Sequence, residues 1–114
     1  HPQLEASLKC ASAIGAALNA AEFTASRYHA DPVVGESRPF ADEANGVHYF
    51  DNLAVLKTAS VPALLFEAGV IVNRAEELRM RDPEVRKRIV GAIVTGIDGC
   101  VPKKINLHEG SSGK

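Results

Sequence analysis

The sequence lacks tryptophan, has few aromatic residues and contains only two cysteines. Aromatic residues make up 5% of its 114 residues, whereas hydrophobic residues make up 46%. Enough apolar side chains are therefore present for one small folded domain, and its core must come from Leu, Ile, Val and Ala. The cysteines, Cys10 and Cys100, are too far apart in the sequence to indicate a zinc site.

A surplus of one charge and a long apolar run are also missing. Thirteen Lys and Arg residues against 14 Asp and Glu residues leave a net charge of -1, which gives no electrostatic basis for binding nucleic acid. No apolar stretch approaches the ~20 residues of a membrane-spanning helix, so we do not expect an integral membrane protein. The chain begins at His1 without an initiator methionine. We therefore expect a piece of a longer protein.

The two cysteines have two interpretations. The preferred one is a pair of separate, small hydrophobic side chains. The alternative is a Cys10–Cys100 disulfide, which requires an oxidising compartment and Cα atoms within about 7 Å.

Three segments have the pattern of helices. In residues 2–21, apolar side chains recur at spacings of three and four. Asn73 is a candidate N-cap with a glutamate three residues later, which predicts a short helix over 74–80. The Asp82–Glu84 segment starts another helix, which should stop at Gly99.

Between the first two helices, residues 30–52 are rich in turn formers and acidic residues, which predicts a long loop. The Leu53–Leu56 run is either a helical turn or a strand. Residues 1–100 are expected to form the domain, and residues 101–114 a flexible tail.

The most informative segment is Val61–Asn73, with sequence VPALLFEAGVIVN. Its apolar run leaves no polar face, which is typical of a strand inside a mostly parallel sheet. We therefore predict an α/β fold: the carboxyl half of a three-layer architecture with a mostly parallel sheet covered by helices. Glu67 follows the run with no Lys or Arg beside it in sequence, so its carboxylate requires a partner, a hydrogen bond or a metal. The carboxyl end of a strand is where such sheets bind ligands.

This segment resembles the closing motif of the zinc-dependent N-acetylmuramoyl-L-alanine amidases of the amidase-3 family. That motif is approximately Pro-Ala-apolar-Leu-apolar-Glu-x-Gly-Phe-apolar-apolar-Asn, and Val70 stands here in place of its Phe. The Leu53–Lys57 segment and the first and last helices are also similar, so the resemblance covers most of residues 4–98. It implies a peptidoglycan hydrolase that cleaves the amide between N-acetylmuramic acid and L-alanine, outside the cytoplasmic membrane, in the periplasm or secreted.

The resemblance assigns roles residue by residue. Glu67 matches the family's catalytic glutamate, which acts as general base and then protonates the leaving amine. Asn73 matches the family's asparagine and is interpreted first as a helix cap, with substrate binding as a weaker alternative. The family's zinc ligands, His, Glu and His, precede the helix that starts this chain, and their motifs are not found here. We therefore expect the ligands to lie upstream of His1, and this chain alone to be incomplete and inactive. The implied partners are peptidoglycan, the missing amino-terminal half of the domain and a regulatory activator protein.

The four histidines do not replace the missing zinc ligands. His29 begins a His-Ala-Asp segment similar to a family motif, but it follows the first helix instead of preceding it, so we interpret it as a loop histidine. His1, His48 and His108 lie in the terminus, an irregular segment and the tail, and no pair has helical zinc-site spacing. In the long loop, Arg38 and its neighbour Glu36 are interpreted as part of a solvated turn, with the lining of a peptide groove as the alternative.

Two other hypotheses stay open. The chain is either a non-catalytic fragment that binds peptidoglycan or a partner protein, or an unrelated α/β domain in which Glu67 is a hydrogen-bonded core carboxylate.

Overall fold

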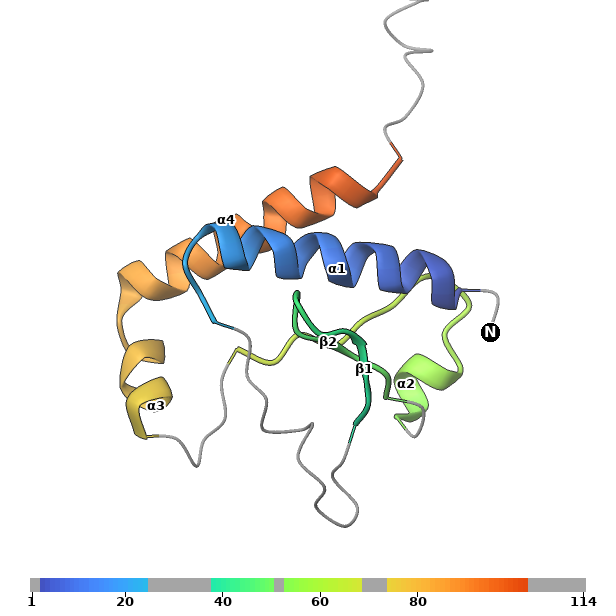
Figure 1. The fold of residues 1–114 in the computed structure, drawn as a ribbon, viewed down its shortest axis with the longest axis horizontal. Helices are drawn as coiled ribbons and strands as arrows, with labels where there is room; N and C mark the ends of the chain where they lie inside the picture. Colours follow the sequence, from blue (N-terminus) through green and yellow to red (C-terminus); the bar gives the residue numbers. More distant parts are fainter. Residues whose placement is uncertain (1–2, 25–37, 51–52, 69–73, 103–114) are drawn as a thin grey trace, which may run out of the picture.

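The computed structural model describes residues 3–24, 38–50, 53–68 and 74–102. Within these ranges it contains helices and one two-stranded antiparallel sheet: α1 (Leu4–Ala20), β1 (Phe40–Asp42), β2 (Val47–His48), α2 (Ala54–Lys57), α3 (Arg74–Met80) and α4 (Pro83–Cys100). Helices α1 and α4 pack against each other, and the β1–β2 hairpin lies against α1 (Figure 1). The fold is thus a helical pair with a small hairpin beneath it.

The predictions of the three helices are confirmed. Helix α4 begins where its cap signal placed it: Asp82 has extended backbone dihedrals, and its side chain accepts a hydrogen bond of 2.9 Å from the Glu84 N–H. The helix ends at Cys100, one residue beyond the expected stop at Gly99. The Leu53–Leu56 run, whose structure the sequence left open, forms the short helix α2.

The core lies where α1 crosses α4. The buried hydrophobic side chains of the described residues come mainly from these helices: Ile14, Val47, Ile89, Ala92 and Cys100. Gly96 permits the close approach, because a Cβ atom at this position would lie 2.5 Å from the Cα atom of Ile14. The backbones of the two helices therefore approach each other closely at this point.

A disulfide joins the two helices at one end of this contact. Cys10 on α1 is bonded to Cys100, the last residue of α4, with 5.0 Å between their Cα atoms. The preferred interpretation of two separate thiols was wrong. The helix pairing brings together two residues that are 90 positions apart, and the sequence pattern did not encode that pairing.

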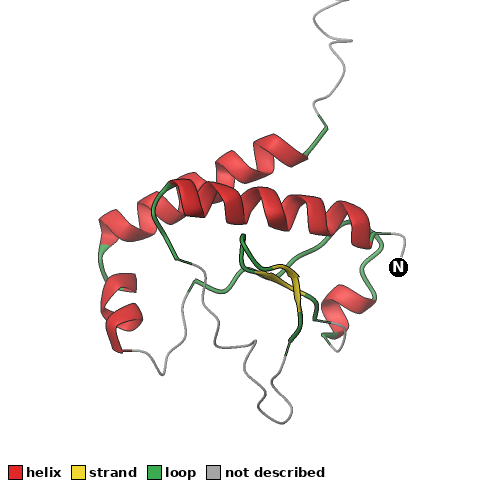
Figure 2. Cartoon of the chain, in the orientation of Figure 1, coloured by secondary structure: helices red, strands yellow, loops and turns green. Residues whose placement is uncertain are grey.

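The prediction of a mostly parallel sheet covered by helices was wrong. Residues 61–68 form no strand, and the sheet of the described residues has only the β1–β2 pair (Figure 2). The apolar run instead passes beneath α1, where the Ala63 N–H donates a hydrogen bond of 2.9 Å to Ser7 Oγ. Leu64 and Leu65 are 37% and 51% exposed, so the run is not covered on both faces. The unbroken apolar sequence predicted a strand buried inside a sheet. Among the described residues, no neighbouring strand pairs with this segment.

The loop predicted over 30–52 also needs correction in part, because β1 and β2 lie inside it. Their register pairs Phe40 with His48 and Asp42 with Val47, with one irregularity between the two pairs. Gly46 occupies the turn with a φ of 68°, a left-handed conformation that suits glycine. No helix in the described ranges is long and apolar enough to cross a membrane. The predicted tail lies almost entirely outside these ranges.

Candidate functional site

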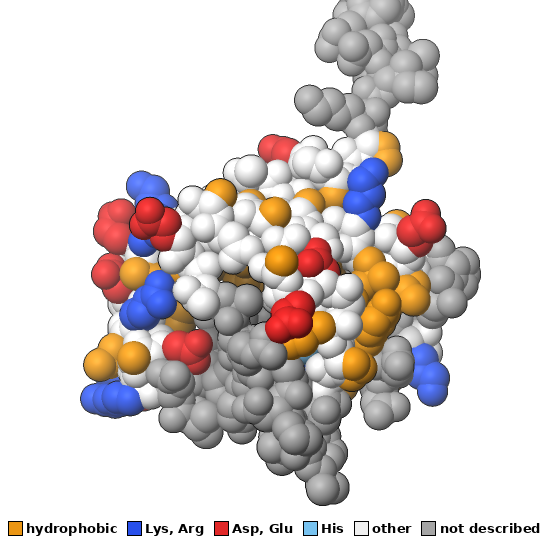
Figure 3. Space-filling view, in the orientation of Figure 1, with side chains coloured by type: hydrophobic (Ala, Val, Ile, Leu, Met, Phe, Trp, Pro, Cys, Tyr) orange, Lys and Arg blue, Asp and Glu red, His pale blue; other side chains and the backbone are white. Residues whose placement is uncertain are grey.

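A cavity of about 310 Å³ lies between α1, the hairpin and residues 63–68, and α3 and α4 also contribute to its wall. Most of its lining side chains are apolar. The charged residues in its lining are Arg38, Glu67, Glu76 and Arg79. An apolar hollow with a few charged groups is the usual form of a binding site. Figure 3 shows hydrophobic side chains reaching the surface between α1 and α2.

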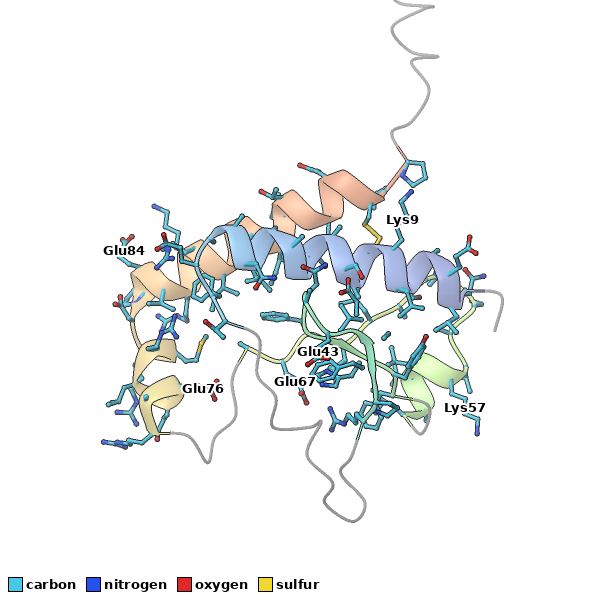
Figure 4. All side chains as sticks on the ribbon, viewed as in Figure 1. Lys9, Glu43, Lys57, Glu67, Glu76 and Glu84 are labelled. Atoms are coloured by element: carbon cyan, nitrogen blue, oxygen red, sulfur yellow. A yellow bond between two sulfur atoms is a disulfide. The ribbon has the colours of Figure 1, made fainter. Side chains whose placement is uncertain are left out.

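Glu67 lies at this cavity, and its side chain points away from α1 (Figure 4). The side chain is 39% exposed, so water reaches the carboxylate. Arg38 Nη1 lies 3.4 Å from each of the two carboxylate oxygens. The sequence offered no basic neighbour for Glu67, and the fold supplies one from 29 residues away. Glu67 is thus a charged, paired and accessible carboxylate, and it does not end a buried strand.

Arg38 is held in turn by an aromatic ring. Its guanidinium carbon lies 4.0 Å from the ring centroid of Phe50, a cation–π contact, and its side chain is 20% exposed. Arg38 and Phe50 flank the two strands, where the Tyr49 N–H donates a hydrogen bond of 2.9 Å to the Pro39 carbonyl. The open end of the hairpin therefore carries both residues towards Glu67.

The turn end of the hairpin is fastened to α1. Asn19 Nδ2 donates hydrogen bonds to the Ala44 carbonyl at 2.8 Å and to Asn45 Oδ1 at 3.1 Å. Below this contact the Asn45 carbonyl lies so close to Gly15 that a Cβ atom there would overlap it. The position of the hairpin, and with it that of Arg38, thus depends on α1.

Within the turn, Asp42 organises the backbone. Its carboxylate accepts hydrogen bonds from Asn45 Nδ2 at 2.8 Å and from the Asn45 N–H at 3.4 Å. The side-chain hydrogen bond from Asn45, and then one from Ser12, lower the pKa of Asp42 below its ordinary value of 3.8. Both bonds favour the ionised carboxylate, so the folded turn is more stable when Asp42 is ionised.

Asn73, His1, His29, Glu36 and His108 fall outside the described residues.

His48, on β2, lines the cavity, and its ring stacks on Phe40 at a centroid distance of 4.2 Å. The fold brings Glu67 and His48 to one cavity. In the described ranges, however, no group of three His, Cys, Asp or Glu side chains lies close enough to hold a metal ion.

The sequence pattern did not identify Arg38 and Phe50 as parts of the candidate site. Arg38 was interpreted as part of a solvated turn, yet its side chain packs on Phe50 and pairs with Glu67. One signal was present: Asn45-Gly46 is the dipeptide most typical of a hairpin turn. The dipeptide predicts a hairpin but not its register: the observed pairing of Phe40 with His48 is what sets Arg38 and Phe50 side by side.

Comparison with known proteins agrees with the resemblance seen in the sequence. Residues 2–99 match the family model described as N-acetylmuramoyl-L-alanine amidase. No curated protein and no solved structure matches the chain. The matched region begins just before α1, ends one residue before the end of α4, and includes the hairpin, the residues that line the cavity and Glu67. Because it covers most of the sequence, the chain belongs to the N-acetylmuramoyl-L-alanine amidase family.

Proposed function

We propose that this chain takes part in hydrolysis of the amide between N-acetylmuramic acid and L-alanine in peptidoglycan, with Glu67 as general base and then general acid. The family match supports the substrate and the reaction class. The observation that carries the role of Glu67 is its position: an accessible carboxylate at the edge of an apolar cavity, paired with Arg38.

The chemistry requires one group that accepts a proton and then returns it. A water molecule adds to the lactyl carbonyl carbon while the Glu67 carboxylate takes a proton from it. The C–N bond then breaks, and the same carboxyl group gives the proton to the departing nitrogen of L-alanine. The products are a free lactyl carboxylate and a free amine. The partial exposure of Glu67 allows water and substrate to reach the carboxylate.

Zinc is the metal that the family resemblance implies, and we keep it in the proposal as the family's cofactor. The described residues do not fit a zinc site, because no three potential ligands lie together. The steps above therefore assign a chemical role only to Glu67. A periplasmic or secreted location follows from the proposed substrate and belongs to the same proposal. A regulatory activator protein, which the family resemblance implies as a partner, belongs to it as well.

The test compares two glutamate variants of the full-length protein on purified peptidoglycan. Glu67→Gln keeps the shape of the side chain and removes its ability to take a proton. Release of stem peptides should fall by about 10²- to 10⁴-fold, the usual contribution of one acid–base group. Glu84→Gln is the control, since Glu84 is an exposed residue of the first turn of α4 and does not line the cavity.

Two results would contradict the proposal. Wild-type release of stem peptides by Glu67→Gln would remove Glu67 from the mechanism. Binding of peptidoglycan by the wild-type protein with no newly exposed amino group of L-alanine would indicate a binding module instead of an amidase.

A further inference from the structure

The contact between Arg38 and Glu67 has an unusual form for an ion pair. We propose that Arg38 is a positioning residue, which fixes the orientation of the Glu67 carboxylate at the cavity. This inference rests on the proposed function of Glu67. It adds a residue from the hairpin to a site that the family motif places in residues 62–73.

The contact between Arg38 and Glu67 is made by one nitrogen and both carboxylate oxygens. A single nitrogen, Nη1 of Arg38, lies 3.4 Å from both Oε1 and Oε2 of Glu67. Charge-assisted N–H···O bonds are usually about 2.7–2.9 Å long, and the strongest Arg–carboxylate pairs use two nitrogens. The contact is therefore long and symmetrical. A contact to both oxygens orients the plane of the carboxylate.

The guanidinium of Arg38 is itself held in place by Phe50. The guanidinium carbon lies over the Phe50 ring, 4.0 Å from the ring centroid, and the Arg38 side chain is 20% exposed, against 72% for the surface residue Arg74. A planar group stacked on a ring loses little further freedom when it binds a carboxylate. Lysine carries the same charge but lacks the planar face, so it would not keep this geometry.

The hairpin that carries Arg38 and the segment that carries Glu67 are both attached to helix α1. Arg38 belongs to a hairpin whose turn is bonded to Asn19 of α1. The Glu67 segment is bonded to α1 through Ser7 and Ala63. The distance between Arg38 and Glu67 is therefore set by two attachments to one rigid element, which is the arrangement that positioning requires.

The test measures kcat and KM separately, on a soluble muramoyl-peptide, with the full-length protein. Arg38→Ala should lower kcat by about 10- to 100-fold and leave KM within about twofold, since a misplaced catalytic group slows the reaction without removing substrate contacts. Arg38→Lys should recover little of that loss. Phe50→Leu keeps Arg38 but removes the aromatic ring that the guanidinium contacts, so this variant should lower kcat partially.

Chemical rescue separates positioning from damage to the fold. Millimolar guanidinium should restore part of the kcat of Arg38→Ala, because the ion can occupy the place beside Phe50. It should not restore Glu67→Gln. Arg74→Ala is the matched control: it also loses an arginine–glutamate pair, at 3.3 Å to Glu77, but on the exposed face of α3. Its kcat should equal that of the wild type.

The outcomes distinguish this inference from the proposed function. If Glu67→Gln is inactive but Arg38→Ala keeps the wild-type kcat, the positioning role is wrong and the function stands. If Arg38→Ala raises KM alone, Arg38 binds substrate and does not position Glu67. If Arg38→Lys matches the wild type, charge alone matters and the planar contact with Phe50 is irrelevant. If Glu67→Gln is fully active, the proposed function itself fails.

Discussion

At the scale of single residues, protonation of the Asp42 carboxylate should change the stability of the fold. Its pKa in the folded chain is lowered, chiefly by the hydrogen bond from Asn45, so the ionised form stabilises the folded state. That contribution is complete above the ordinary carboxyl value of 3.8. It is lost as the pH falls through the lowered value, because the unfolded chain then binds a proton more readily than the folded one.

The measurement is urea unfolding of the wild type and Asp42→Asn across the acid range. The wild type should be more stable near neutral pH, and the difference in unfolding free energy should shrink as the pH falls below the ordinary value. Asn45→Ala, which removes the main hydrogen bond, should weaken this pH dependence. A difference between wild type and Asp42→Asn that stays constant through the acid range would show that the turn does not depend on this charge.

Glu67 and Arg38 differ in how well the sequence predicts their place in the candidate site. The sequence alone names Glu67 as a candidate, because the family motif surrounds it, and the structure places it at a cavity. Its partner Arg38 is not identifiable, because no local rule joins residues 29 positions apart. Only the hairpin and its attachment to α1 bring the guanidinium to the carboxylate.

At the scale of elements, the contact between α1 and α4 depends on one glycine. Gly96→Ala should destabilise the chain, because the new methyl group would meet the Ile14 backbone and the two helices would have to separate. Overpacking of this kind costs about 1–3 kcal/mol. Thermal unfolding followed by circular dichroism would measure the change.

Gly91→Ala is the matched control on the same helix. A Cβ atom at Gly91 meets nothing within 4 Å, and alanine is the better helix former by roughly 0.5–1 kcal/mol. This variant should unfold at the same or a higher temperature than the wild type. Equal melting temperatures for Gly96→Ala and the wild type would mean that the close helix contact does not exist in solution.

The helices were predictable because their signals are local. Spacing defines α1, and the Asp82 cap defines the start of α4, within the residues that form each element. The 61–68 segment was not predictable by the same means. Its composition indicates a buried strand, but a strand also requires a hydrogen-bonded neighbour, and the described residues instead join Ala63 to Ser7 of α1.

At the scale of the whole molecule, stability should depend on the redox state. The core is small, and no large side chain among the described residues is completely buried. The Cys10–Cys100 bond closes a loop across a separation of 90 residues. In the chain-entropy model, a loop of this length contributes roughly 4–5 kcal/mol by restricting the unfolded chain.

Urea unfolding with and without a thiol reductant would test this. Reduction should lower the unfolding free energy of the wild type by up to about that amount. The double variant Cys10→Ser with Cys100→Ser should match the reduced wild type and should not respond to the reductant. A wild type that unfolds identically in both conditions would show that the bond does not form or does not stabilise the fold.

The same bond has a topological consequence. Arg38, Phe50 and Glu67 all lie between the two cysteines along the chain, so they belong to a closed covalent ring from which both chain ends extend. A single break in the backbone of this ring would open it without freeing either piece. The hairpin and the Glu67 segment would remain parts of one molecule until a second break or loss of the disulfide parted them.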